Sequence, residues 1–373
     1  MHKQLLAAMP MLLLVAACNA PVEGPGWQSL DCQSALQGHA GTISAVWAKD
    51  GNHAWALTDD GRVLYYDGET CVQEAQAPSG VELRSIWGEA SAAQIWAVGA
   101  DALGNGFIFR RDHTGWSPEA PNTTSSLVRV WGTAETGPIA VGYFPHAVMS
   151  RRDGVWGLAY GNTADPAALD PQPGVPFNLA GVGPISTSSR LAFVDVGGTG
   201  PNDLWVIGLE GAHYDGESWT PNATYQLRHD QVTEQRPISA HTDSESKRSW
   251  MVGADATLYH LQADYEVWDE SVVLTDASLH AIHSGGPNST VWAVGSQGVI
   301  AKQVAEQYAS FDVVMLTTES SDVNPEEHIE WLNADPNVTN GNVNFHGVWV
   351  DAEGGVWVVG EQAHWLYRSP VAS

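Results

Sequence analysis

Four histidines stand at corresponding places in a repeating sequence and could bind a metal ion or another ligand. His241 and His283 share one repeat position, and His280 and His346 share a second position three residues earlier. Neutral imidazole is a common metal ligand. Residues three apart on a strand point to opposite sides, so the histidines form two sets, and neither set supplies the three ligands of a catalytic zinc site. Hydrogen-bonded structural histidines are the main interpretation, and a metal site is the alternative.

A second group of possible ligands carries oxygen atoms. It consists of Asp335, Asn337, Thr339 and Asn342. Oxygen ligands suit calcium, but Gly341 comes one place too late for the spacing of a calcium-binding loop. We therefore expect no cofactor, with calcium or another divalent metal as the alternative.

The histidines belong to a repeat marked by the motif Trp-x-Val-Gly. Its clearest copies begin at Trp96, Trp205, Trp292 and Trp357, and weaker copies lie near Trp55, Ile139 and Trp250. Most copies begin about 42 residues apart, which is the period of propeller blades. Two intervals are longer by about 23 residues, too few for another repeat. The sequence therefore contains seven repeats and two insertions.

Each repeat contains four short runs of aromatic and β-branched residues separated by turn residues, as expected for four strands. Seven such repeats predict an all-β, seven-bladed β-propeller. The last repeat has only three runs, and the segment 26–30 looks like an isolated fourth strand. Its Trp27 matches Trp116, Trp156 and Trp219 of the other fourth strands. We expect this segment to complete the last blade and close the ring.

First strands line the central channel of a propeller, so their alignment predicts the channel wall. The last channel position is the one at the end of each first strand, and it is assigned to Trp47, Trp87, Trp131, Val196, His241, His283 and Trp349. The position three residues earlier is assigned to Ser44, Arg84, Val128, Phe193, Ile238, His280 and His346.

The N-terminus has the pattern of an export signal. Residues 1–17 form the predicted signal peptide, with basic residues followed by an apolar stretch. The stretch ends in Val-Ala-Ala and Cys18, which resembles the bacterial lipobox. The resemblance implies that Cys18 is lipidated and that 18–25 is a tether before the propeller at 26–373. Asn19 in place of Asp implies the outer membrane, facing the periplasm or the surface.

Cys32 and Cys71 are the other two cysteines of the chain. An even number of remaining cysteines in an exported protein favours a disulfide. Cys71 takes the fourth-strand tryptophan position of the first blade, and Cys32 follows the closing strand. A bond between them would fasten the closure to the neighbouring blade; two free buried thiols are the alternative.

The net charge of −27 excludes nucleic acid as the main partner, because the surface repels phosphates. We expect a monomer that contacts the membrane through its lipid anchor only.

The insertions, at 159–190 and 317–344, are the first candidates for a binding surface, since long loops often carry function. The run 324–332 predicts a short helix with Asn at the N-cap and Pro at the first position. His328, Trp331 and Leu332 would share one face of that helix. This face either binds a partner or packs Trp331 onto a blade.

The repeat resembles that of bacterial lipoproteins with Trp-Ala-Val-Gly and Asp-Gly-x-x-Trp motifs, which are related to Asp-box propellers. The resemblance covers about residues 26–370 and implies the fold. Sialidases, the nearest enzymes, need three channel arginines, and only Arg84 and Arg129 lie on first strands, at positions expected to point oppositely. We therefore expect a non-catalytic, lipid-anchored scaffold that binds a protein or glycan; the alternative is a glycan-active hydrolase or lyase with a channel site.

Overall fold

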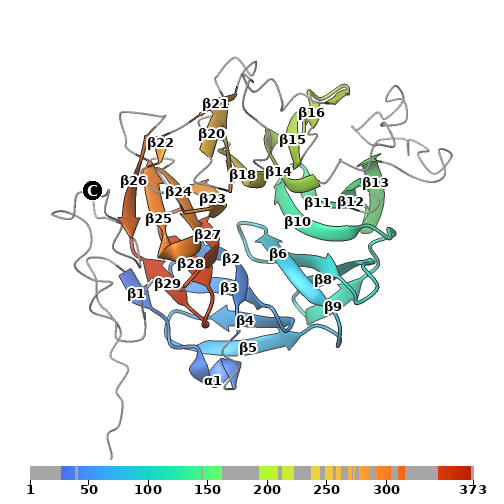
Figure 1. Cartoon of the computed structure of the whole chain (residues 1–373). Helices are drawn as coiled ribbons and strands as arrows, with labels where there is room; N and C mark the ends of the chain where they lie inside the picture. Colours follow the sequence, from blue (N-terminus) through green and yellow to red (C-terminus); the bar gives the residue numbers. More distant parts are fainter. Residues whose placement is uncertain are drawn as a thin grey trace, which may run out of the picture.

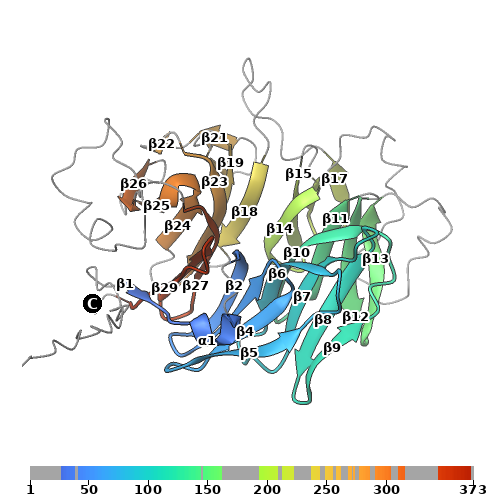
Figure 2. The ribbon, with the colours of Figure 1, turned by 60° about the horizontal axis from the view of Figure 1, so that its bottom comes forward.

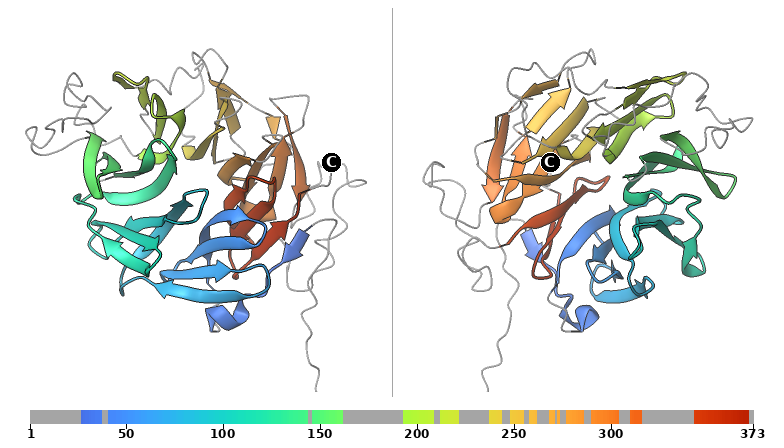
Figure 3. Two further views of the ribbon diagram at one scale, coloured as in Figure 1. Left: turned by 180° about the vertical axis from the view of Figure 1, so that it is seen from behind. Right: turned by 45° about the vertical axis from the view of Figure 1, so that its right-hand side comes forward.

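Seven β-sheets follow one another around a ring, as Figure 1 shows for the computed structural model. The structure describes residues 27–37, 41–143, 146–161, 193–208, 212–221, 237–243, 248–254, 258–261, 268–270, 272–273, 277–285, 290–303, 310–315 and 343–370. Figure 3 shows the same order of sheets from two other directions. The predicted seven-bladed β-propeller is confirmed.

Each blade contains four antiparallel strands with the first strand innermost, and the strands follow chain order in every blade except the last. The first strands are β2 (Ile43–Asp50), β6 (Glu82–Gly88), β10 (Ser126–Thr133), β14 (Phe193–Gly200), β18 (Pro237–Asp243), β23 (Leu279–Gly285) and β27 (Phe345–Val350). The second strands are β3 (His53–Thr58), β7 (Ile95–Ala100), β11 (Gly137–Tyr143), β15 (Asp203–Gly208), β19 (Arg248–Gly253), β24 (Thr290–Gly295) and β28 (Val356–Gly360).

The outer strands complete the blades. The third strands are β4 (Arg62–Tyr66), β8 (Gly106–Asp112), β12 (Ala147–Arg152), β16 (Ala212–Tyr214), β20 (Leu258–Leu261), β25 (Ile300–Gln303) and β29 (Trp365–Arg368). The fourth strands are β5 (Cys71–Gln76), β9 (Gly115–Glu119), β13 (Val155–Gly161), β17 (Trp219–Pro221), β21 (Trp268–Glu270), β26 (Ser310–Met315) and, for the last blade, β1 (Trp27–Ser29). One further strand, β22 (Val272–Val273), pairs in parallel with β26, which the repeat did not predict.

The ring closes as the sequence predicts. Strand β1 pairs with β29 antiparallel, with Trp27 opposite Arg368. The short helix α1 (Gln33–Leu36) follows and lies against β5, as Figure 2 shows. Cys32 and Cys71 form a disulfide with their Cα atoms 5.1 Å apart, so the predicted bond is confirmed. It joins the segment after the closing strand to the outer strand of the first blade.

The glycine of the Trp-x-Val-Gly motif is explained by a close approach of backbone. A Cβ on Gly99 would overlap the carbonyl oxygen of Glu82, and one on Gly295 would overlap that of Ser278. Both carbonyls belong to the entry of the first strand of the same blade. The tryptophan of the motif lies on the second strand and packs between blades. Trp96 and Trp357, for example, are fully buried.

Charged clamps join neighbouring blades on the outer strands. Glu119 of β9 accepts hydrogen bonds from Arg151 Nη2 at 2.8 Å and Trp156 Nε1 at 2.9 Å in the next blade. Burial would raise the pKa of Glu119, but these bonds outweigh it, so its pKa lies below the usual value. Glu74 repeats the arrangement one blade earlier with Arg111 and Trp116. The repeat therefore encodes polar contacts between blades as well as an apolar core.

None of the helices in the described ranges is long and apolar enough to cross a bilayer. The signal peptide, Cys18 and the tether lie outside the described residues.

Candidate functional site

A central channel runs between the seven first strands and widens at one end. Its narrow part has a volume of about 70 Å³. At the end where the first strands begin, it opens into a cavity of about 630 Å³, which we call the mouth cavity. Thr42 and Glu82, at the entry of two first strands, and Glu361, after a second strand, line this cavity. The mouth face therefore carries the loops that enter the first strands and those that follow the second strands.

A β-bulge in every first strand builds the wall of the mouth cavity. The pairing register skips one residue at the same place in all seven strands. A bulged residue takes no place in the strand ladder and re-aims its side chain. Each of these residues lines the mouth cavity, and we call the set the bulge ring: Ser44, Arg84, Val128, Val194, Ile238, His280 and His346.

The bulges correct two predictions. All four repeat histidines line the channel, His280 and His346 at the mouth and His241 and His283 farther in, rather than pointing to opposite sides of their strands. Arg84 and Arg129 likewise both line the mouth cavity. The extra residue shifts the alternation of side chains by one place between the mouth position and the deeper channel position.

The alignment of the fourth blade was wrong by one residue. Trp205 pairs with Gly197, as Trp55 pairs with Trp47 in the first blade. The last channel position of that blade is therefore Gly197 and not Val196, and the bulge residue is Val194 and not Phe193. Six of the seven last positions carry an aromatic or imidazole ring, and Gly197 is the exception.

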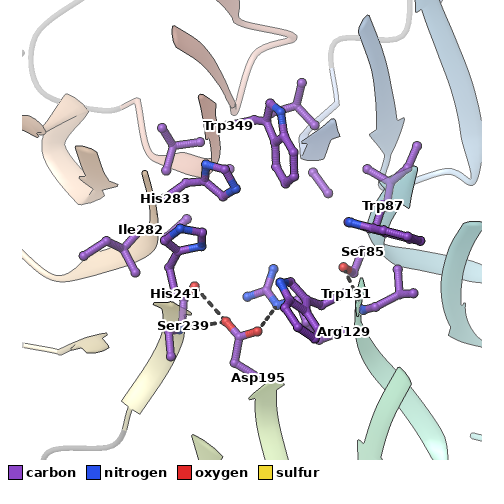
Figure 4. A pocket seen from close by; sticks show the side chains of 18 of the residues that line it. Ser85, Trp87, Arg129, Trp131, Asp195, Ser239, His241, Ile282, His283 and Trp349 are labelled. Atoms are coloured by element: carbon purple, nitrogen blue, oxygen red, sulfur yellow. Dashed lines mark hydrogen bonds and ion pairs between the residues drawn. The ribbon is translucent and has the colours of Figure 1, made fainter. Parts of the chain in front are cut away.

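The corrected register reveals a polar cluster that the sequence reading missed. Asp195 now corresponds to Arg129 in the preceding blade and to Ser239 in the next. Its buried carboxylate lies 3.0 Å from Arg129 Nε and accepts a bond of 2.9 Å from Ser239 Oγ (Figure 4). The Ala240 amide donates to the same carboxylate at 2.7 Å. Burial raises the pKa of Asp195, against the effect of Arg129 and these bonds.

His241 and His283 are in contact deeper in the channel, with ring centroids 4.2 Å apart and planes tilted by 40°, and the His283 ring lies 3.9 Å from that of Trp349 (Figure 4). His241 Nε2 lies 2.9 Å from Ser284 Oγ, which donates its own proton to Asp243 at 2.9 Å. The Val350 amide donates to His283 Nδ1. Burial lowers the pKa of His241 to about 4 and that of His283 well below its usual value. Both rings are therefore neutral at pH 7.

His280 and His346 stack in the mouth with their planes 7° apart. His280 Nδ1 is bonded to the Phe345 carbonyl at 2.8 Å, and His346 Nε2 lies 3.7 Å from Glu361. Burial and the neighbouring His280 lower the pKa of His346. Within the described ranges no three histidine, cysteine or acidic side chains converge on a point that a metal ion could occupy.

The charged groups of the mouth are organised by hydrogen bonds. Arg84 donates to Glu82 at 2.8 Å and to Ser126 Oγ at 2.8 Å. Glu361 accepts from the Asn344 side chain at 3.0 Å. Burial opposes ionisation of Glu361, but its bonds from Asn344 and the nearby His346 keep its pKa below the usual value. The mouth therefore holds fixed charges.

Among the described residues, two large apolar side chains are exposed on the mouth face. Leu103 is 87% exposed at the tip of a turn that Asp101 fixes by bonds to Leu103 N and Asn105 N. Ile238 of the bulge ring is 36% exposed. The two insertions connect fourth strands to first strands, so the chain enters and leaves both of them at this face. His328, Trp331, Leu332 and the oxygen ligands at 335–342 lie outside the described residues.

Solved structures with similar folds are propellers. YCF48 bound to a D1 peptide is 14% identical with a TM-score of 0.59, covering 94% of this chain and 97% of that one. The WD40 propeller domain of Doa1 is 12% identical with a TM-score of 0.60, covering 93% and 98%. YCF48 from Cyanidioschyzon merolae is 16% identical with a TM-score of 0.60, covering 92% and 99%. These likenesses show the fold. No family model and no curated protein matches the sequence.

Proposed function

We propose that this chain is a non-catalytic, lipid-anchored propeller that binds a protein partner through its mouth face at the bacterial outer membrane. The observation that carries the binding role is the open cavity of about 630 Å³ at the mouth, within the size range of ligand sites. The exposed Leu103 and Ile238 add apolar contact area on the same face. The propeller fold is consistent with a binding role, and one similar structure, that of YCF48, holds a peptide.

The order of the channel hydrogen bonds argues against a serine nucleophile in the channel. A serine nucleophile needs a histidine that takes its proton and an acid that orients the histidine. Here Ser284 lies between the other two groups and donates its proton to Asp243. Its oxygen is then left to accept from His241 Nε2, so His241 does not activate it.

Photo-crosslinking can test the binding face. A photoreactive amino acid replaces Leu103 on the mouth face in one strain and Val155 on the opposite face in another. Val155 follows a turn between third and fourth strands and is 60% exposed, so it is a matched control. We expect a discrete partner adduct from position 103 and none from position 155. Adducts from position 155 alone, or equal adducts from both, would contradict the proposal.

The anchor rests on the signal sequence and Cys18 and is tested separately. Cells fed an alkyne fatty acid should label the wild-type protein, with the label in the outer-membrane fraction. Cys18→Ser should remove the label and release the protein from that fraction. Retention of the label in this variant would refute the anchor and leave the binding face unaffected.

A further inference from the structure

The bulge ring is divided into an apolar half and a polar half. Val128, Val194 and Ile238 stand on three consecutive blades and form a continuous apolar arc. His280, His346, Ser44 and Arg84 fill the other four blades. One side of the mouth cavity therefore offers apolar contact, and the other offers hydrogen bonds and charge.

Among the described residues, the wall of the mouth carries more acidic than basic groups. It has three carboxylates, on Asp59, Glu82 and Glu361, and two guanidinium groups, on Arg84 and Arg129. Arg84 is bonded to Glu82, and Arg129 contacts the buried Asp195 below the cavity. Glu361 is held by Asn344, a neutral donor, and its side chain remains 33% exposed. Glu361 therefore offers an ionised carboxylate to the cavity.

The position of Glu361 sets the geometry of a ligand. It lies beside His346 of the last blade, across the ring from the apolar arc of the third to fifth blades. A cation bound near it gains from a carboxylate at a partly shielded site, where charges interact more strongly than in open water. An apolar side chain beside that cation would be removed from water against Val194 and Ile238. The channel narrows below, so the cavity takes side chains from above.

We infer that the mouth cavity binds a peptide segment in which a lysine or arginine side chain lies close to an aliphatic or aromatic one. The cationic group contacts Glu361, and the apolar group covers the arc around Ile238. This inference rests on the proposed function and adds the chemistry of the partner segment to it. It agrees with the net charge of −27, which attracts basic partners.

A phage library of random 12-residue peptides, selected on the purified soluble propeller, can test the inference. The enriched peptides should pair a basic residue with a neighbouring apolar one. Glu361→Gln keeps the size of the side chain and removes the charge, and its amide oxygen can still accept one of the two hydrogen bonds from Asn344. Ile238→Thr keeps the β-branched shape and reduces apolar contact. Each should weaken the selected peptides about fivefold, as expected for one partly exposed charge pair or apolar contact.

Glu217→Gln is the matched control, since Glu217 is exposed in a turn at the opposite end of the blades. It removes the same charge and should leave peptide affinity unchanged. Equal weakening by Glu217→Gln would show attraction to the acidic surface in general and overturn the inference. Enriched peptides that are acidic, or that ignore both mouth variants, would also overturn it. If Leu103 still gives a specific crosslink in that case, the binding face stands and only the ligand chemistry is wrong.

Discussion

Replacing His241 with glutamine should make the protein less sensitive to mild acid. Burial lowers the pKa of His241 to about 4, whereas a histidine in an unfolded chain titrates near ~6.5. As the pH falls below ~6.5, His241 binds a proton in the unfolded chain but stays neutral in the folded channel. The folded pKa is the lower one, so the free energy of unfolding falls as the pH drops from about 6.5 to about 4.

The size of the effect follows from the width of that window. One pH unit is worth ~1.4 kcal/mol for a proton bound only by the unfolded state. Between pH 6.5 and pH 5, His241 therefore accounts for a loss of ~2 kcal/mol. Glutamine does not titrate, and its amide can donate to Ser284 Oγ in place of the ring Nε2. The variant should lose ~2 kcal/mol less than the wild type over this range.

Urea unfolding at pH 7.5 and pH 5.0, followed by tryptophan fluorescence, measures the difference. His113→Gln is the control, because the His113 side chain is 90% exposed on a turn. Its unfolding free energy should change with pH as that of the wild type does. The reasoning is refuted if His241→Gln and the wild type lose the same free energy between the two pH values.

Three further predictions concern the blade clamps, the disulfide and the anchor. Glu119→Gln should lower the unfolding free energy by ~2 kcal/mol in urea, because it leaves Arg151 without its counter-charge, whereas the exposed Glu69→Gln should change it little. Cys71→Ser should cost ~2–4 kcal/mol and abolish the effect of a reducing agent on thermal melting; equal sensitivity to reductant before and after the change would contradict the bond. Cys18→Ser should prevent fatty-acid labelling, with Cys32→Ser as the control that keeps it.

The fold was predictable because the same physical constraint recurs in each blade. Gly99 and Gly295 must lack a Cβ because a carbonyl oxygen at the start of the first strand lies too close for one. Trp96 and Trp357 must fill the space between neighbouring sheets. Such constraints leave a visible period in the sequence. The closing strand was predictable for the same reason, since Trp27 meets the packing requirement of the other fourth-strand tryptophans.

The channel wall was harder to predict because its spacing is not uniform. The step from Trp131 to Gly197 includes an insertion, and glycine at the last position left no side chain to align on. The alignment placed Val196 at the position of Gly197, so Asp195 no longer corresponded to Arg129. Contacts such as Asp195 to Ser239 also join residues on different blades, which no local pattern encodes. The cluster emerges only when the strands are placed side by side.

The bulge positions can change residue type with little effect on strand pairing. A bulged residue is left out of the strand ladder, so pairing does not restrict its type. The seven bulge positions carry serine, arginine, valine, isoleucine and histidine, whereas the second strands keep nearly constant tryptophan and glycine. Packing therefore restricts the residue types of the second strands more than those of the bulge ring. A change such as Ile238→Thr should accordingly alter peptide affinity and leave thermal stability nearly unchanged, whereas Gly99→Ala should do the reverse.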